Sequence, residues 1–322
     1  MNHIAQAKLF IYQLPFKVPL NFKGQLLTYR SGLILQLQDE QGRYGLGEIA
    51  PLAGFSRETL VEARDQIIAH LSTATHPLNK LQNGYPSVQF GLENALNYTP
   101  FSRVASCTES IPLIQGSADQ VIEHYLALQK PNLIKLKVAR HRVSDEVQLF
   151  NQLARLNRHL KIRCDANQAW DFQQADDFFS QIEIEQLDYI EEPTASHLHN
   201  IRLAQRHRFF LALDESLQDK DFVYQHHPAI KAFVLKPMLI GTRQRIDYFI
   251  AIAKQHHLQV SFSSSFESVL GLSQITHLAD RYRGVDINLG LDTLKYFQAQ
   301  QLTKSNQIVT DIETLECLWT SR

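Results

Sequence analysis

The stretch Ile162-Arg163-Cys164-Asp165-Ala166-Asn167 predicts a buried β-strand that ends in a carboxylate. The same pattern, an apolar run closed by a charged residue, recurs on both sides of it. The other runs are Leu133–Val138, Tyr189–Glu191, Leu211–Asp214 and Phe233–Lys236. They recur roughly every 20 to 30 residues, which is the spacing of a strand, a helix and two short loops.

Three further strands are predicted at 112–116, 258–263 and 285–290, which brings the number from Ile111 onward to eight. Apolar residues at helical spacing predict helices between the strands, among them one over 117–129 and one capped by Ser144. Eight parallel strands with intervening helices close into a barrel of about 200 residues. The serine run at 263–265 is then a loop at the barrel mouth.

Residues up to about 100 do not show the alternation of strands and helices that begins at Ile111. They predict antiparallel strands at 9–12, 32–37 and 44–49, a turn at 39–42, a helix with Ser56 as its N-cap and a second helix from Ser87. We therefore expect an α/β fold in which an N-terminal α+β capping domain (1–103) precedes a (β/α) barrel (104–300). Residues 301–322 would pack back on the cap.

The segment Gly45-Leu46-Gly47-Glu48-Ile49-Ala50 has the letters of a dinucleotide-binding fingerprint. That motif requires a helix starting on its glycines, whereas Pro51 follows here, so we reject the match. The loops predicted at Leu20–Gly24 and Leu52–Phe55 either connect elements or cover a ligand.

The composition excludes several classes of function. A formal net charge of −1 over 322 residues gives no electrostatic reason to expect nucleic acid or an anionic membrane as a partner, and no protein partner is implied. The cysteines, Cys107, Cys164 and Cys317, form no C-x-x-C pair, which suits a reducing compartment. With no signal peptide or transmembrane pattern, the sequence predicts a cytoplasmic protein.

The charged strand ends predict the chemistry, because the carboxyl ends of barrel strands open onto one face. Lys135 and Lys137 are two apart on a strand, so both side chains point to the same face. Two residues along a strand span about 6.6 Å. At that separation, repulsion by the Lys135 ammonium destabilises the charged form of Lys137 by roughly 2.5 kcal/mol, which lowers the pKa of Lys137 from about 10.4 to about 8.5. Lys236 and a bound dication would lower it further, which would make Lys137 a general base. The plainer interpretation is that the lysines only pair with a carboxylate such as Asp165.

Asp165, Glu191 and Asp214 end three successive strands. Three neighbouring carboxylates without His or Cys favour Mg²⁺ over zinc. The alternative is that they pair only with the lysines. With every group charged, the three acids, one Mg²⁺ and three ammonium groups sum to about +2, so the site predicts a small dicarboxylate substrate.

These residues resemble the enolase superfamily, in particular its muconate-cycloisomerase-like branch. The motifs that carry the resemblance are Lys135-x-Lys137, Asp165-Ala166-Asn167, Glu191-Glu192-Pro193, Asp214-Glu215-Ser216 and Lys236-Pro237. Within that branch the chain is similar to the o-succinylbenzoate synthase family. The supporting stretches are 47–56, 86–91, 263–268 and 290–294.

The resemblance implies a modified TIM barrel, (β/α)7β, and Mg²⁺ as cofactor, with Mn²⁺ able to substitute. It implies syn-dehydration of 2-succinyl-6-hydroxy-2,4-cyclohexadiene-1-carboxylate to o-succinylbenzoate in menaquinone biosynthesis, through an enediolate stabilised by the metal. Lys137 would be the base, Lys135 would keep its pKa low and Lys236 would face the ring as a cation. Ser263, Gly290 and Asn167 would contact substrate, and Arg163 would either support the site or form a structural ion pair.

Two alternatives remain. An N-acylamino acid racemase or dipeptide epimerase of the same superfamily also needs two lysines on opposite walls. A barrel that kept the fold only for binding would normally have lost a metal ligand or a base, whereas this sequence keeps all five groups. Titration with Mg²⁺, followed by assay of the purified protein against both substrate classes, distinguishes all three.

Overall fold

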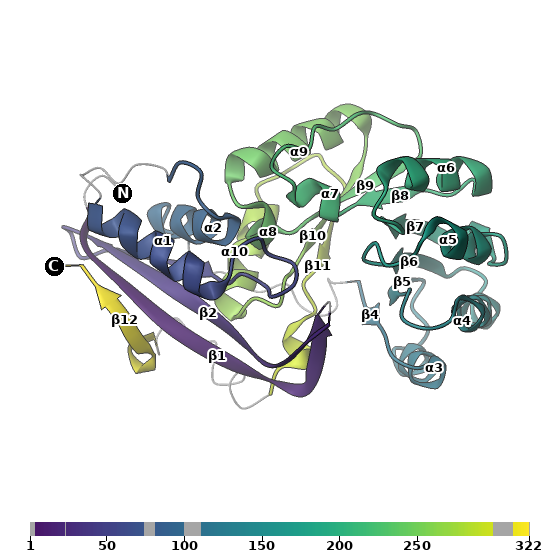
Figure 1. The fold of residues 1–322 in the computed structure, drawn as a ribbon, viewed down its shortest axis with the longest axis horizontal. Helices are drawn as coiled ribbons and strands as arrows, with labels where there is room; N and C mark the ends of the chain where they lie inside the picture. Colours follow the sequence, from purple (N-terminus) through teal and green to yellow (C-terminus); the bar gives the residue numbers. More distant parts are fainter. Residues whose placement is uncertain (1–3, 23, 74–80, 100–110, 299–311, 322) are drawn as a thin grey trace.

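The computed structural model describes residues 4–22, 24–73, 81–99, 111–298 and 312–321. Cys107 and the predicted domain boundaries at 103/104 and 300/301 lie outside these ranges, so the boundaries stay predictions. Within the described residues the chain forms two sheets, a four-stranded antiparallel one and an eight-stranded parallel one. Figure 1 shows the long strands of the first sheet beside the second.

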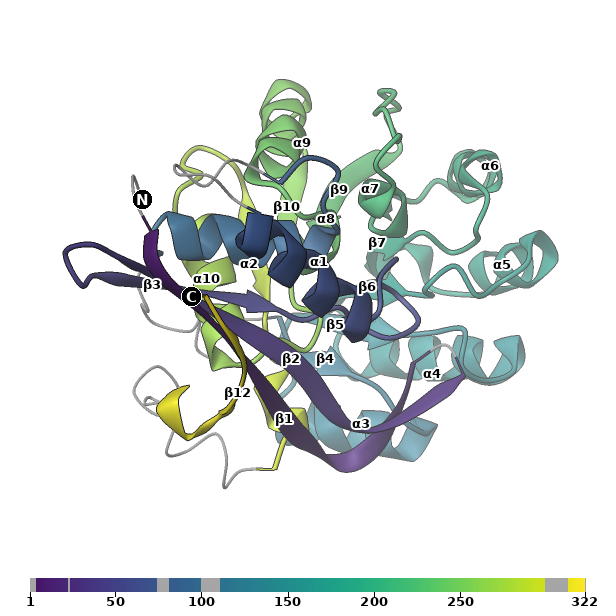
Figure 2. The same ribbon diagram turned by 60° about the vertical axis from the view of Figure 1, so that its left-hand side comes forward.

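The first sheet has the order β12-β1-β2-β3. Its strands are β1 (Ile4–Phe22), β2 (Gln25–Asp39), β3 (Tyr44–Ile49) and β12 (Glu316–Thr320), and its helices are α1 (Leu60–Thr73) and α2 (Pro86–Leu96). A core that includes Leu9, Leu33, Leu35, Ile67 and Leu92 joins this sheet to both helices. In Figure 2, β12 lies alongside β1, so strands from opposite ends of the chain share this sheet.

The second sheet has the order β11-β10-β9-β8-β7-β6-β5-β4. Its strands are β4 (Leu113–Ile114), β5 (Leu133–Lys137), β6 (Lys161–Asp165), β7 (Leu187–Glu191), β8 (Leu211–Leu213), β9 (Ile230–Leu235), β10 (Gln259–Ser263) and β11 (Ile287–Gly290). All described neighbours are parallel, and a hydrogen bond from Ile111 N to the Leu289 carbonyl (3.2 Å) joins the two ends. The predicted α/β barrel with an N-terminal α+β cap is confirmed.

Helices surround this sheet. They are α3 (Ala118–Ala127), α4 (Val143–Leu156), α5 (Phe172–Phe179), α6 (His197–His207), α7 (Glu215–Gln218), α8 (Pro237–Ile240), α9 (Arg243–His256) and α10 (Val269–Ala279), with short 3₁₀ turns at Ile184–Gln186, Leu294–Tyr296 and Ile312–Thr314. Alternate strand residues pack against these helices in two apolar clusters. The other strand residues face the barrel axis, where Tyr189, Ala212, Ala232 and Val234 are packed together.

Two predicted helix caps are wrong. Helix α1 begins at Leu60, not after Ser56, because Thr59 and Glu62 form a reciprocal cap in which Thr59 Oγ1 accepts from Glu62 N and Glu62 Oε2 accepts from Thr59 N. Ser56 Oγ instead accepts from Leu52 N (2.8 Å). Ser144 lies inside the first turn of α4 and donates to Asp145 Oδ1, so it does not cap that helix.

The predicted first strand is too short, and Leu20–Phe22 is not a loop but the end of β1. Apolar alternation continues past Tyr12 through the buried Leu14 and Phe16. The prolines are tolerated because pairing with β2 is interrupted between Pro15 and Leu20 and then resumes.

The glycines of the rejected fingerprint lie in β3, and Gly47 is required there for packing. A Cβ built on Gly47 would stand 1.8 Å from the Gly91 carbonyl oxygen of α2, which is backbone and cannot rotate away. Gly47→Ala is therefore expected to lower the free energy of unfolding by about 2 kcal/mol. Urea denaturation checks this, and an unchanged midpoint at an unchanged m-value would contradict the close approach.

No helix among the described residues is long and apolar enough to cross a lipid bilayer.

Candidate active site

A cavity of about 670 Å³ opens at the carboxyl ends of the barrel strands. The ends of β5, β6, β7, β10 and β11 line it from below, together with Lys236, which follows β9. Leu20–Phe22 of β1, Leu52 and Phe55 line it from the cap. The two cap segments that the sequence singled out as possible covers therefore do border the cavity.

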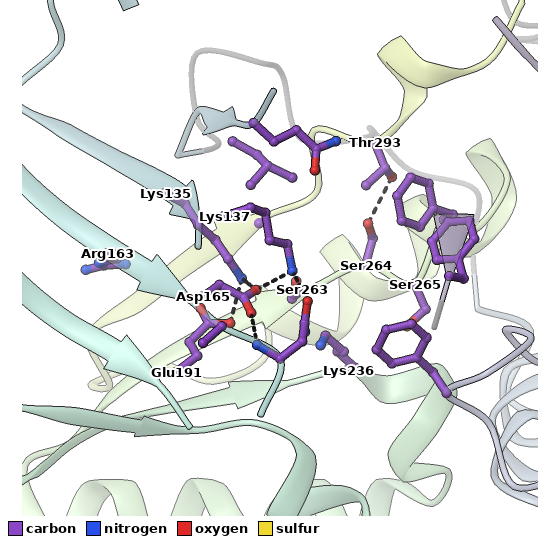
Figure 3. A pocket seen from close by; sticks show the side chains of 18 of the residues that line it. Lys135, Lys137, Arg163, Asp165, Glu191, Lys236, Ser263, Ser264, Ser265 and Thr293 are labelled. Carbon is purple, nitrogen blue, oxygen red and sulfur yellow. Dashed lines mark hydrogen bonds and ion pairs between the residues drawn. The ribbon is translucent and has the colours of Figure 1, made fainter. Parts of the chain in front are cut away.

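The three lysines line its floor together with Asp165 and Glu191, and Figure 3 shows the side chains of Lys135, Lys137, Asp165 and Glu191 directed toward one another. Lys135 Nζ lies 2.6 Å from Asp165 Oδ2 and 2.6 Å from Glu191 Oε2. Lys137 Nζ lies 2.7 Å from the same Asp165 oxygen and donates to Asn167 Oδ1 at 2.7 Å. Both lysines thus lie on the same face of β5, as strand alternation requires.

The three lysines differ in their electrostatic environment. Burial lowers the pKa of Lys137, and the Lys135 and Lys236 ammonium groups add to this against the opposing effect of Asp165. From the sequence we expected the Lys135 ammonium to be the main cause of the lowered pKa of Lys137, but burial is the larger cause. Burial acts on Lys135 too, yet Asp165, Glu191 and Asp214 together raise its pKa well above the usual range. Asp214 and Glu215 likewise raise the pKa of Lys236 against its burial.

The predicted metal ligands are all buried, with exposed fractions of 1% for Asp165, 2% for Glu191 and 0% for Asp214. Asp165 and Glu191 face each other across the β6–β7 ladder and share the Lys135 ammonium. Asp214 follows β8 and pairs with the Lys236 ammonium. Within the described ranges, no three His, Cys, Asp or Glu side chains stand close enough together to hold a metal ion.

The donor set nevertheless fits a hard dication. All its atoms are carboxylate oxygens, and the Lys135 ammonium already occupies a cation position between two of the groups. Burial, together with the nearby Asp165 and Asp214, raises the pKa of Glu191 to about 8 against the opposing effect of the Lys135 ammonium, so this carboxylate needs more positive charge than Lys135 provides. A dication would supply it.

Two residues of the sequence motifs fix the strand ends. Glu192, the second acid of the E-E-P motif, accepts hydrogen bonds from Asp214 N (2.8 Å) and Ser216 N (3.0 Å) and thereby ties the end of β7 to the end of β8. Asn167, at a positive φ of 45°, donates to Glu215 Oε1 (3.1 Å) while accepting from Lys137. The backbone after β6 is thus held where its side chain reaches the lysine.

The remaining predicted residues are also at the cavity. Ser263 and Gly290 end β10 and β11, are paired in register and line the cavity. Arg163 forms an ion pair with Asp188 (2.7 Å) and stacks on Tyr189, with 4.6 Å from its guanidinium carbon to the ring centroid. Of the two interpretations of Arg163, the structural ion pair is the one observed.

Sequence reasoning missed Arg140, His141 and Phe266, which joins Phe22 and Phe55 of the two predicted cover segments. Arg140 and His141 follow β5 and line the cavity; the rule that residues after a barrel strand lie at its mouth would have found them. Phe266, from the loop after β10, packs edge-to-face on Phe22, which in turn contacts Phe55. These rings come from segments too far apart in sequence to form a recognisable pattern.

Two family models match the chain. Residues 4–99 match the model described as MenC, N-terminal domain, and residues 118–312 match the model described as Enolase C-terminal domain-like. The barrel with acids and lysines at its strand ends is therefore that of an enolase-superfamily enzyme. A dipeptide epimerase from Cytophaga hutchinsonii shares the fold, with a TM-score of 0.75 at 18% identity over 92% of this chain and 88% of its own.

Comparison with individual proteins shows which family of this superfamily the chain belongs to. An o-succinylbenzoate synthase from Yersinia enterocolitica is 33% identical over 98% of this chain and 99% of its own length, and one from Haemophilus influenzae is 30% identical over 95% and 96%. The crystal structure of o-succinylbenzoate synthase from Thermosynechococcus elongatus, complexed with Mg in the active site, has a TM-score of 0.78 at 26% identity and covers 96% of this chain and 100% of its own. The chain belongs to the o-succinylbenzoate synthase family.

Proposed function

We propose that this protein dehydrates 2-succinyl-6-hydroxy-2,4-cyclohexadiene-1-carboxylate to o-succinylbenzoate in menaquinone biosynthesis, with Mg²⁺ as cofactor and Mn²⁺ able to replace it. The observation that carries the mechanism is the asymmetry among the three lysines. Lys137 alone has a lowered pKa, and it stands beside the buried carboxylates at the cavity floor. The family relationship supports the substrate.

Asp165, Glu191 and Asp214 would hold the metal, which when bound draws negative charge onto the substrate carboxylate and so acidifies the adjacent carbon. Lys137, as the neutral amine, takes the proton from that carbon. It returns the same proton to the hydroxyl on the same face as the carbon–oxygen bond breaks, so that water leaves and the ring becomes aromatic. One residue thus acts as base and then as acid.

The other two lysines keep their protons throughout. Lys236 is tied to Asp214 and faces the ring as a cation, a contact worth roughly 0.5 to 2 kcal/mol. Lys135 holds Asp165 and Glu191 together and keeps positive charge beside Lys137. Ser263, Gly290 and Asn167 contact the substrate, the first two along its succinyl chain.

The racemase or epimerase alternative is favoured by one observation, which is that Lys137 and Lys236 line the same cavity. The electrostatics disfavour it, because the base for the second face would have to be Lys236, whose pKa is raised by Asp214. A two-base racemisation needs each lysine to accept a proton in one direction.

The purified protein with Mg²⁺ is expected to convert the cyclohexadiene substrate to o-succinylbenzoate, seen as the loss of diene absorbance and the appearance of the aromatic product by chromatography. An N-succinylamino acid, followed by polarimetry, is the comparison substrate. Racemisation without dehydration would replace the proposal by the alternative. Binding of Mg²⁺ without turnover of either substrate would indicate a binding protein.

A further inference from the structure

Arg140 differs from the other cationic residues that line the cavity. Lys135, Lys137, Lys236 and Arg163 each form an ion pair with a carboxylate. Among the described residues, Arg140 has no carboxylate partner, and its guanidinium Nη2 donates only to the neutral Asn167 Oδ1 at 3.3 Å. Its side chain is exposed, so an anion entering the cavity can reach it.

The loop that carries Arg140 is held in place before any ligand arrives. The buried carboxylate of Glu146 accepts backbone hydrogen bonds from Ala139 (3.0 Å), Arg140 (2.7 Å) and His141 (3.1 Å). Ala139 takes a positive φ of 61°, a conformation that costs a non-glycine residue energy and is maintained by these contacts. The position of the Arg140 backbone is thus preorganised at the rim of the cavity.

The arginine also lies close to the reacting groups, because Asn167 Oδ1 accepts from both the Lys137 ammonium and the Arg140 guanidinium. A ligand whose reacting carbon meets Lys137 would therefore extend past Arg140 if its substituent points toward the loop after β5. No described carboxylate would compete for the guanidinium.

This inference rests on the proposed function, whose substrate is a dicarboxylate. The carboxylate on the ring of this substrate would lie beside the metal, and the second carboxylate ends the succinyl chain. Ser263 and Gly290 offer only neutral donors to that chain, so the charge at its end needs a separate counter-ion in the half-enclosed cavity. We propose that Arg140 binds the terminal carboxylate of the succinyl chain through the fork of its guanidinium, which matches a carboxylate in shape.

The test compares two probes on the Mg²⁺-loaded protein by calorimetry. They are o-succinylbenzoate and its derivative in which the chain-terminal carboxylate is a carboxamide. Arg140→Ala is expected to weaken binding of the diacid roughly 10- to 100-fold and to leave binding of the amide unchanged. Arg140→Lys is expected to restore part of the diacid affinity, because charge returns without the fork. In turnover the same variants should raise KM and change kcat little.

Arg142→Ala is the matched control. Arg142 lies on the same loop, is 84% exposed in its side chain, pairs with Asp145 and does not line the cavity, so its loss removes the same charge from a neighbouring position. It is expected to bind both probes like the wild type.

Equal weakening of both probes by Arg140→Ala would overturn the inference, since the arginine would then act through Asn167 or the loop. An unchanged diacid affinity would overturn it too. Wild-type protein that binds the diacid more tightly than the amide, in an Arg140-dependent way, but forms no product would refute the proposed reaction and leave this contact standing. Wild-type protein that binds neither probe would refute both.

Discussion

Lys137→Ala is expected to lower the rate of dehydration by about 10²- to 10⁴-fold, the contribution typical of a positioned general base. The loss should be this large because no other lysine of the site can take over. Asp165 and Glu191 hold Lys135 as an ammonium, and Asp214 does the same for Lys236. The variant should also fail to return a proton to the departing hydroxyl, so both steps are lost together.

The fold should survive this change. Lys135 still neutralises Asp165 when Lys137 is removed, and the thermal midpoint by circular dichroism checks this. Lys161→Ala is the control, since Lys161 begins β6 at the opposite end of the barrel and donates to the Glu185 carbonyl (2.6 Å). Should Lys137→Ala keep more than about 5% of the wild-type rate, Lys137 is not the base.

Glu191→Gln is expected to weaken Mg²⁺ binding by at least about 100-fold and to abolish dehydration. Changes to groups that only support metal ligands already cost about 10- to 100-fold, so loss of a ligand should cost more. Without metal, the glutamine side chain of Glu191→Gln should not destabilise the folded protein. Burial and the neighbouring Asp165 and Asp214 raise the pKa of Glu191 to about 8, so removing its charge relieves a repulsion that the Lys135 ammonium only partly offsets.

A thermal melt with and without Mg²⁺ separates these effects. The wild type should melt higher when Mg²⁺ is added, because a ligand that binds only the native state stabilises it. The variant should start no lower than the metal-free wild type and show no such rise, whereas Glu185→Gln, a change at an exposed position at the opposite end of the barrel, should keep it. A Glu191→Gln protein that Mg²⁺ still stabilises would remove this residue from the ligand set.

The barrel was predictable because its signal is local and repeated. A run such as Leu211–Asp214 is apolar because the strand is buried on both faces, and its last residue is charged because it pairs with Lys236, which lines the cavity. The strand lysines and acids therefore indicated both the fold and the floor of the site. Arg163 lies two residues before Asp165 on β6 and so on the same face of the strand, and a structural ion pair, now seen with Asp188, was one of the two roles predicted for it.

Other features depend on contacts between segments that sequence spacing does not reveal. Ser56 and Ser144 were plausible N-caps from the sequence. In the structure Thr59 and Glu62 cap the first helix instead, and Glu146 accepts hydrogen bonds from the loop that precedes its own helix. The same contact of Glu146 fixes the loop of Arg140, although the place of Arg140 just after β5 already indicates a residue of the barrel mouth. The cover of Phe22, Phe55 and Phe266 likewise needs cap and barrel to be docked.

The pairing of β12 with β1 has a consequence for synthesis of the protein. Because β12 follows the whole barrel in the chain, the outer edge of β1 stays unpaired on the ribosome until the last strand emerges. An open strand edge invites pairing with other nascent chains. The enzyme should therefore be most prone to aggregate during translation, and truncation before Glu316 should reduce its yield in cells more than its catalytic rate.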